Sequence, residues 1–363
     1  MGKGIDLTKK DIHNILLIQL GDIGDVVLSF PCIRALRENF PKATIIVAVR
    51  EKARELIEDC PWSTGVISVN KEKRSLGQEI EYQKNFLLGL RRFRFDLVID
   101  MRTGTRGAIL TLLTGARYRV GYRGDGKGWR NRIFNHLASD EYVPRQYVGD
   151  YYFRLLMTYG FRTEDVRPEL RVPRERRKRA AALLKEHGVL LDQPLIVVQP
   201  FSLWHYKEWG IDKYIQLINW IGIKYRFPVV LTGSSAERGR IVEIIKRCKE
   251  NVYNLAGETS IGAFSAILGY CRLFIGVDSS GMHISGAVGT PTVTIFGPSS
   301  PVSWAPRGEK HVVVQKDFSC VPCRRKGCDD SEVSRCLEEL TVEEVSSAVE
   351  RQLYHRQPSS ERG

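Results

Sequence analysis

The stretch NILLIQLGDIGDVVLSFPCIRAL, residues 14–36, joins a short apolar run to an amphipathic segment through a turn with two glycines and two carboxylates. Apolar residues at 14–20 predict a buried strand, and apolar residues at helical spacing from Asp25 to Glu38 predict a helix. Glycines in such a turn let a ligand or another loop come close to the backbone. Asp25 is then either a helix N-cap or a carboxylate that faces a ligand.

The turn lacks the glycine spacing of a dinucleotide-binding loop. GxGxxG needs two close glycines before a third, whereas this turn has only GxxG, at Gly21 and Gly24. An acid in place of the third glycine would repel a pyrophosphate. The turn therefore favours a ligand that carries hydroxyl groups and argues against an NAD-dependent dehydrogenase.

Strand-like and helix-like segments alternate along both halves of the chain, which predicts an α/β protein with two doubly wound, Rossmann-like domains. A proline-punctuated basic segment, 171–188, separates the halves and places the boundary near Val172. The expected domains are 1–172 and 173–345, followed by a C-terminal helix and tail, 346–363. Such domains usually bind a ligand in the cleft between them, at the carboxyl ends of their strands. The predicted strands are 14–20, 43–49, 65–70, 96–100, 194–199, 228–233, 252–257, 273–278 and 290–297.

The composition is that of a globular protein with anionic partners. The chain has 363 residues, 43% hydrophobic and 27% charged, and a net charge of +13. This charge favours nucleic acid, phosphorylated small molecules or an anionic membrane surface. No apolar run reaches the roughly 18 residues of a transmembrane helix, and the N-terminus lacks the apolar core of a signal peptide. We therefore expect a cytoplasmic protein.

The positive charge is concentrated between residues 101 and 132, where eight Lys or Arg residues face one acid. This stretch is either a solvated basic face or a loop that grips phosphates or carboxylates through charge-assisted hydrogen bonds. Arg102, Arg106 and Arg123 belong to this stretch.

Two strand ends in the second half are candidate phosphate sites. Ser202 and Lys207 follow the strand at 194–199 and could donate to a phosphate, although a surface lysine in a loop is common. The run GVDSSGMHISGA, 276–287, places small residues before a helix, whose first N–H groups and dipole attract anions. In this run Ser279 and His283 could add donors.

A third strand end carries Glu237. Its carboxylate either accepts from ribose hydroxyls or complements the dipole of the following helix.

The chain has eight cysteines, and four of them are close in sequence: Cys320, Cys323, Cys328 and Cys336. Four thiolates suit a structural zinc ion, but the spacing is not that of a zinc ribbon, so reduced thiols or a redox-labile pair are the alternatives.

Taken together, these segments resemble the lipopolysaccharide heptosyltransferases of glycosyltransferase family nine. The resemblance extends over nearly the whole chain. It is carried by ILLIQLGDIGDVVLSFPCIRALRENFPKATI, PFSLWHYKEW, VDSSGMHISGAVGTPTVTIFGPSSPVSWAP and the CVPCRRKGC…RC segment. It implies a GT-B fold and an inverting transfer that needs neither metal nor cofactor. The sugar is heptose from ADP-heptose, and the acceptor is the inner core of lipopolysaccharide, a lipid A–Kdo or heptosyl acceptor.

The resemblance also assigns roles. The acid of the GD turn matches Asp25 as general base, which takes the proton of the acceptor hydroxyl. Ser280 stands where the family usually has glycine, and Gly281 follows one place later, so the phosphate turn departs from the family pattern. Donor binding maps to Ser202, Lys207, Asp278, Ser279, Gly281 and His283, with Glu237 added as a ribose contact.

The anionic acceptor implied by the resemblance fits Arg102, Arg106 and Arg123 of the N-terminal domain, with Arg106 as the best single acceptor contact. The basic surface fits contact with the inner face of the inner membrane. Other interpretations stay open: a relative that uses another nucleotide sugar or acceptor, a non-catalytic relative, or a protein that binds nucleic acid or other anions. The presence of Asp25 argues against a non-catalytic relative. The lack of an RNA-recognition signature argues against nucleic acid as a partner.

Overall fold

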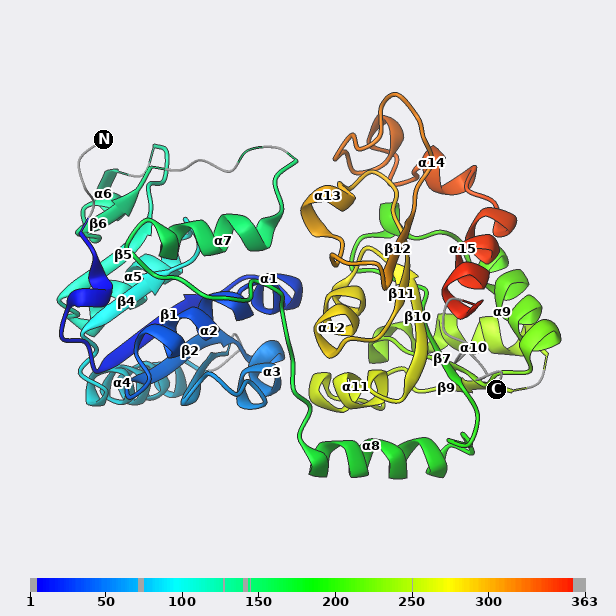
Figure 1. The fold of residues 1–363 in the computed structure, drawn as a ribbon, viewed down its shortest axis with the longest axis horizontal. Coiled ribbons are helices and arrows are strands. Elements are labelled where there is room, and N and C mark those ends of the chain that lie inside the picture. Colours follow the sequence, from blue (N-terminus) through cyan, green and yellow to red (C-terminus); the bar gives the residue numbers. More distant parts are fainter. Residues whose placement is uncertain are drawn as a thin grey trace, which may run out of the picture. The chain divides into compact units, whose positions relative to one another are not determined.

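The computed structural model describes residues 5–70, 75–126, 128–139, 143, 145–249 and 251–354. The chain divides into two compact units, Met1–Pro168 and Glu169–Gly363. Figure 1 shows that each unit is a twisted sheet with helices on its faces. Within the described segments, no helix combines the length and the apolar character needed to cross a membrane.

The first unit contains a six-stranded, all-parallel sheet in the order β3-β2-β1-β4-β5-β6. This is the Rossmann order, in which the chain starts at the centre, winds to one edge and returns to wind to the other. The strands are β1 (Asn14–Gln19), β2 (Thr44–Arg50), β3 (Gly65–Val69), β4 (Leu97–Asp100), β5 (Tyr118–Tyr122) and β6 (His136–Ala138). The helices are α1 (Ile23–Leu28), α2 (Phe30–Asn39), α3 (Arg54–Glu58), α4 (Leu76–Arg92), α5 (Thr105–Thr114), α6 (Gly128–Asn131) and α7 (Val148–Met157).

The second unit repeats this topology, with the order β12-β11-β10-β7-β8-β9 and parallel pairing throughout. Its strands are β7 (Leu195–Gln199), β8 (Val229–Leu231), β9 (Val252–Asn254), β10 (Cys271–Val277), β11 (Thr292–Ile295) and β12 (His311–Val314). Its helices are α8 (Arg174–Glu186), α9 (Ile211–Tyr225), α10 (Arg238–Arg247), α11 (Ile261–Leu268), α12 (Ser280–Val288), α13 (Pro301–Trp304), α14 (Arg335–Glu338) and α15 (Val342–Tyr354).

The cores explain why the central strands are the most apolar segments of the chain. In the first unit, Leu16 and Ile18 of β1 pack with Val98 of β4 and Leu110 of α5. In the second, the central strands bury a larger cluster that includes Trp209. Strands covered by helices on both sides read as continuous apolar runs, which is why the sequence reveals them.

The structure differs from the sequence-based expectation in the first helix. The predicted helix from Asp25 to Glu38 is two helices, α1 and α2, with Ser29 between them. Pro31 lies in the first turn of α2, where its missing N–H costs no intrahelical hydrogen bond. The hydroxyl of Ser29 donates to the Val26 carbonyl and helps to end α1.

The basic stretch 101–132 is also more ordered than a phosphate-gripping loop. Tyr118–Tyr122 forms strand β5, and Gly128–Asn131 forms the short helix α6. Val120 and Tyr122 are buried in the sheet, and the side chain of Arg130 is fully buried. Part of the expected loop is therefore a strand, whose apolar residues alternate with Arg119 and Gly121 in the two-residue period of a half-buried strand.

Candidate active site

The switch point of the first sheet lies between β1 and β4, where Ile18 pairs with Asp100. The chain leaves these two strands in opposite directions, so their carboxyl ends border a crevice that commonly holds a ligand. The glycine turn follows β1, and Arg102 follows β4. The fold therefore brings Asp25 and Arg102 together although 77 residues separate them.

Asp25 is buried, with 8% of its surface exposed, and three donors surround its carboxylate. Oδ2 accepts from the backbone N–H of Asp22 at 2.8 Å and from Nη1 of Arg102 at 2.9 Å. Oδ1 accepts from the Tyr152 hydroxyl at 2.7 Å. A carboxylate offers about four lone-pair positions. Oδ2 is therefore fully used, whereas Oδ1 accepts one hydrogen bond from the described residues and keeps a second lone-pair position.

Gly21 is required by this packing. A Cβ at Gly21 would lie 2.3 Å from Oδ2 of Asp25 and 2.7 Å from Nη1 of Arg102. Any larger residue would displace the pair. The prediction that the turn needs glycine for a close approach is thus explained at this position by the approach of the protein's own carboxylate.

The N-cap of α1 is Asp22, not Asp25. Asp25 is the third residue of the helix, and its carboxylate returns to the N-cap backbone. Asp22 is exposed and accepts from Arg50 at 3.0 Å and Lys52 at 2.7 Å. The hydrogen bond from Lys52 is the largest cause that holds the pKa of Asp22 below its ordinary value. The two carboxylates of the turn therefore have different partners.

Tyr152, on α7, is a site residue that the sequence did not indicate. Burial, followed by the negative charge of Asp25, raises the pKa of Tyr152 well above its ordinary value. The hydroxyl thus remains a donor to Asp25. A tyrosine 127 residues away from its partner leaves no local pattern, and only the sheet topology places it there.

Asp100, the last residue of β4, lies behind this pair and is 1% exposed. Its Oδ1 accepts from the backbone N–H of Arg102 at 3.2 Å, and Oδ2 contacts Nη2 of Arg130 at 3.4 Å. Burial raises the pKa of Asp100 to about 7, against the opposing effects of the Arg102 N–H and the Arg130 charge. A carboxyl group with this pKa titrates near neutral pH.

This shift predicts a pH-dependent stability that Asp100→Asn removes. The folded chain binds the proton up to about pH 7 and the unfolded chain only up to about its ordinary value of 3.8. Stability conferred by this proton is therefore full below about pH 4 and is lost as pH rises to 7. At about 1.4 kcal/mol per pKa unit the loss is at most roughly 4 kcal/mol. Thermal unfolding at pH 4.5, 6 and 7.5 tests this, and parallel pH curves for both proteins would contradict it.

The other two predicted arginines do not share the environment of Arg102. Arg106 is exposed in the first turn of α5, and Arg123 is exposed after β5. The Arg102 side chain is 44% exposed and reaches the buried carboxylate of Asp25. The structure thus places Arg102 in the site, and contact of Arg106 and Arg123 with an acceptor remains a prediction.

The second unit has its own switch point, between β7 and β10. Nζ of Lys207 lies 2.6 Å from Oδ2 of Asp278, so residues that follow these two strands form an ion pair. Asp278 is 7% exposed and directly precedes Ser279, the N-cap of α12. The pair therefore stands beside the N-terminus of a helix with no acidic residue in its first turn.

Ser279 and Gly281 are positioned by Gln199, which ends β7 and was not predicted as a site residue. The Ser279 hydroxyl donates to Oε1 of Gln199 at 3.1 Å. A Cβ at Gly281 would lie 2.0 Å from the same oxygen. The glycine shifted by one place from the family pattern is thus demanded by the close approach of Gln199.

The loop that carries Ser202 and Lys207 is held by Glu208. The Glu208 carboxylate accepts from the Ser202 N–H at 3.3 Å and from Nη1 and Nη2 of Arg240 at 3.1 and 2.5 Å. The Arg240 guanidinium lies 3.7 Å above the ring of Phe201. Trp209, which follows Lys207 in sequence, is buried. The loop is therefore fixed before Lys207 by the Glu208 contact with Ser202 and after it by the packing of Trp209.

Glu237 and His283 have visible structural roles. Oε2 of Glu237 accepts from the backbone N–H of Ser234 at 2.6 Å, so this acid belongs to a capping box. His283 is 6% exposed in α12, with its ring edge-on to Trp304 at 6.2 Å between centroids. Binding of a donor by either residue stays a prediction.

The cysteine segment lies against the Lys207 loop in the second unit, where the Ser334 hydroxyl donates to the Tyr206 carbonyl at 2.6 Å. Cys336 is buried, while Cys320 and Cys328 are exposed. Burial, followed by the charges of the other three cysteines, raises the pKa of Cys336 to about 11. Within the described ranges, no group of three or more His, Cys, Asp or Glu residues is arranged to hold a metal ion.

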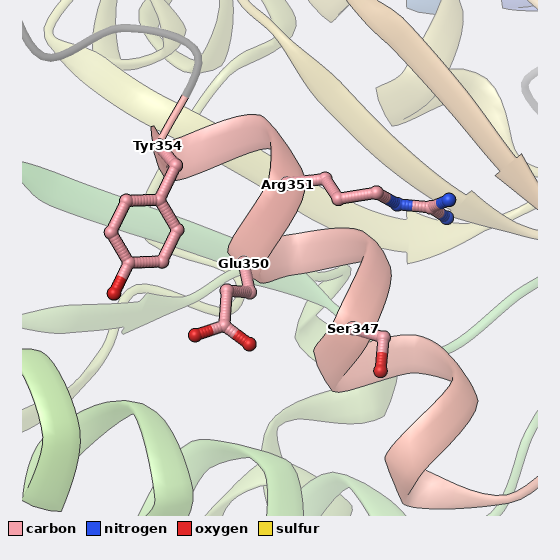
Figure 2. Close-up of a pocket in the computed structure, with 4 residues that line it drawn as sticks. All are labelled: Ser347, Glu350, Arg351 and Tyr354. Carbon is pink, nitrogen blue, oxygen red and sulfur yellow. The ribbon is translucent and has the colours of Figure 1, made fainter.

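A separate groove of about 540 Å³ lies along α15 and is lined by Ser347, Glu350, Arg351 and Tyr354 (Figure 2). Glu350 forms an ion pair with Lys224 of α9. All four lining residues belong to the C-terminal helix, and none follows a strand of the sheet. We therefore place the chemistry at the switch points and not in this groove.

Comparison with known proteins agrees with this architecture. Lipopolysaccharide heptosyltransferase 3 of Escherichia coli K12 is 28% identical over 358 residues, which cover 93% of this chain and 98% of the relative. The structure of E. coli ADP-heptose lps heptosyltransferase II matches with a TM-score of 0.79 at 23% identity, covering 95% of this chain and 100% of the other. An E. coli heptosyltransferase solved with ADP matches with a TM-score of 0.71 at 18% identity, covering 93% and 99%.

Two Rossmann-like units with polar side chains at both switch points define the GT-B class, which confirms the predicted fold. The model of glycosyltransferase family 9 (heptosyltransferase) matches residues 85–333. The chain belongs to this family and is a glycosyltransferase.

Proposed function

We propose that the enzyme transfers heptose from ADP-heptose to the inner core of lipopolysaccharide, with inversion at the anomeric carbon and without a metal ion. Asp25 is the general base, the first unit binds the acceptor, and the second binds the donor. The names of the relatives support the substrate class. The observation that carries the mechanism is the Asp25 carboxylate, buried, held by three donors, and left with one open position on Oδ1.

The chemistry follows from this arrangement. An acceptor hydroxyl donates to Oδ1 of Asp25, which takes the proton as the acceptor oxygen bonds to the anomeric carbon. The bond from that carbon to the diphosphate breaks on the opposite face and the configuration inverts. Arg102 and Tyr152 fix the carboxylate, so no reorientation is needed during the step.

The second unit stabilises the leaving group. ADP gains negative charge as the glycosidic bond breaks, and the Lys207 ammonium and the N-terminus of α12 offer preorganised positive charge. Ser202, Ser279 and Gly281 complete the phosphate-binding surface, and Asp278 holds Lys207 in place. The exposed arginines of the first unit suit an anionic, lipid-linked acceptor at the inner face of the inner membrane.

A transfer assay tests the proposal. Incubation with ADP-heptose and a lipid A–Kdo or heptosyl acceptor should release ADP only when both substrates are present, and chelators should not reduce the rate. Analysis of the product by NMR should show the inverted anomer. Release from UDP-sugars but not from ADP-heptose would overturn the donor assignment, and a retained configuration would overturn the mechanism.

A further inference from the structure

Arg130 is buried completely, although it belongs to the most basic stretch of the chain. Its guanidinium makes four polar contacts inside the first unit, one of them from Nη1 to Oδ1 of the neighbouring Asn131 at 3.4 Å. Nη1 donates to the Tyr122 carbonyl at 2.8 Å, and Nη2 donates to the Arg102 carbonyl at 2.7 Å and contacts the Asp100 carboxylate at 3.4 Å. The ring of Phe134 lies 4.6 Å from the guanidinium carbon.

Two of these contacts, with the Arg102 carbonyl and with Asp100, act on the backbone of Arg102. The Arg130 guanidinium donates to the carbonyl of Arg102, and the Asp100 carboxylate accepts from the N–H of Arg102 at 3.2 Å. The backbone of this one residue is therefore held from both sides by a buried ion pair. The side chain of the same residue donates to Oδ2 of Asp25.

Stability alone does not account for the arrangement. Removing two charges from water costs several kcal/mol per ion, and apolar replacements of buried pairs are often neutral or stabilising. The segment after β4 would otherwise be a loop, whose backbone fluctuates more than a strand. A planar guanidinium with several donors fixes such a backbone more precisely than an apolar side chain does.

We propose that Arg130 and Asp100 are positioning residues, which clamp the Arg102 backbone so that the Arg102 guanidinium meets Asp25 in its catalytic orientation. This inference rests on the proposed role of Asp25. Arg130 acts only through Arg102, and it touches neither substrate nor the reacting atoms.

Arg130→Lys is the decisive variant, because one ammonium cannot reach the carbonyls of Tyr122 and Arg102 and the Asp100 carboxylate in the same geometry. We expect kcat to fall on the order of tenfold or more, because a misplacement of about 1 Å can cost about 100-fold. The KM for ADP-heptose should stay within about twofold, because the donor binds elsewhere. Asp100→Asn should lower kcat in the same direction, and it decides the case if Arg130→Lys does not fold.

The double-mutant cycle with Arg102→Ala separates positioning from stability. If the clamp acts through Arg102, Arg130→Lys and Asp100→Asn should change kcat by no more than about twofold when Arg102 is already absent. Undiminished effects in that background would overturn the clamp. Thermal unfolding of each variant checks that the chain is folded at the assay temperature.

Arg34→Lys serves as the matched control. Arg34, on α2, is also a buried arginine of the first unit, 5% exposed, and its Nη1 lies 2.8 Å from Oδ2 of Asp165. Its replacement should lower the unfolding temperature and leave kcat unchanged at a temperature where the chain is folded. Full activity of Asp25→Asn would refute the proposed role of Asp25 as base, whereas an inactive Asp25→Asn together with additive Arg130 and Arg102 effects would refute only the clamp.

Discussion

Asp25→Asn should lower kcat at least about 100-fold, the usual contribution of a general base. The amide keeps the size of the side chain but cannot take a proton from the acceptor hydroxyl. Donor binding should change little, because we propose that the donor binds the second unit. Acceptor-dependent ADP release under saturating donor measures kcat, and binding of ADP to the variant checks that the donor half is intact.

Asp22→Asn is the control for this substitution. Asp22 lies in the same turn but is exposed and paired with Arg50 and Lys52. Asn is as good an N-cap as Asp, and exposed ion pairs are worth about 0–1 kcal/mol, so activity should drop by no more than about fivefold. Equal losses in the two variants would mean that the turn is merely sensitive to charge, and full activity of Asp25→Asn would remove it as the base.

The roles of the two carboxylates in this turn could be predicted from the sequence only in part. The glycine turn, the strand before it and the candidate Asp25 all follow from local pattern. The choice between an N-cap and a ligand-facing acid depends on Arg102 and Tyr152, which approach from β4 and α7. Such contacts arise from sheet order, which a single sequence does not encode locally.

The fold shows the same division between local and long-range information. Apolar runs predicted the central strands in both halves, because parallel strands covered on both faces are apolar throughout. Strands β5, β6 and β12 were missed, and all three are short: β5 carries Arg119, β6 begins at His136 and β12 begins at His311. A period of two is hard to recognise over only three to five residues.

The two units place the same residue types at the ends of their first and fourth strands. Each first strand ends in a glutamine, Gln19 or Gln199, whose Oε1 accepts from the segment that forms the site: the Gly21 N–H in one unit and the Ser279 hydroxyl in the other. Each fourth strand leads into an aspartate, Asp100 or Asp278, that is paired with a cation. The topology thus supplies a switch point in each unit, and only the side chains decide that one presents a base and the other a cation.

Lys207→Met should lower kcat/KM for the donor about 100- to 1,000-fold, because loss of one preorganised contact to a developing charge costs about 2.7–4 kcal/mol. Most of the loss should appear in kcat, since the diphosphate gains charge only as the glycosidic bond breaks. Initial rates over a range of ADP-heptose concentrations measure both constants. Lys224→Met is the control, because Lys224 pairs with Glu350 on the distant α9 and α15 surface and its loss should change activity by no more than about fivefold.

Lys207→Met also changes the environment of Asp278, so a second substitution is needed to interpret its effect. Removing the ammonium leaves the Asp278 carboxylate, 7% exposed, without its cation at the proposed site of the donor phosphates, and this charge would itself repel them. Lys207→Met combined with Asp278→Asn removes both charges and separates the two effects. If Lys207 stabilises the leaving group, the double variant stays at least about 100-fold below the native enzyme. Recovery to near-native kcat would mean that Lys207 only neutralises Asp278, and the leaving group would then be stabilised by the N-terminus of α12 without it.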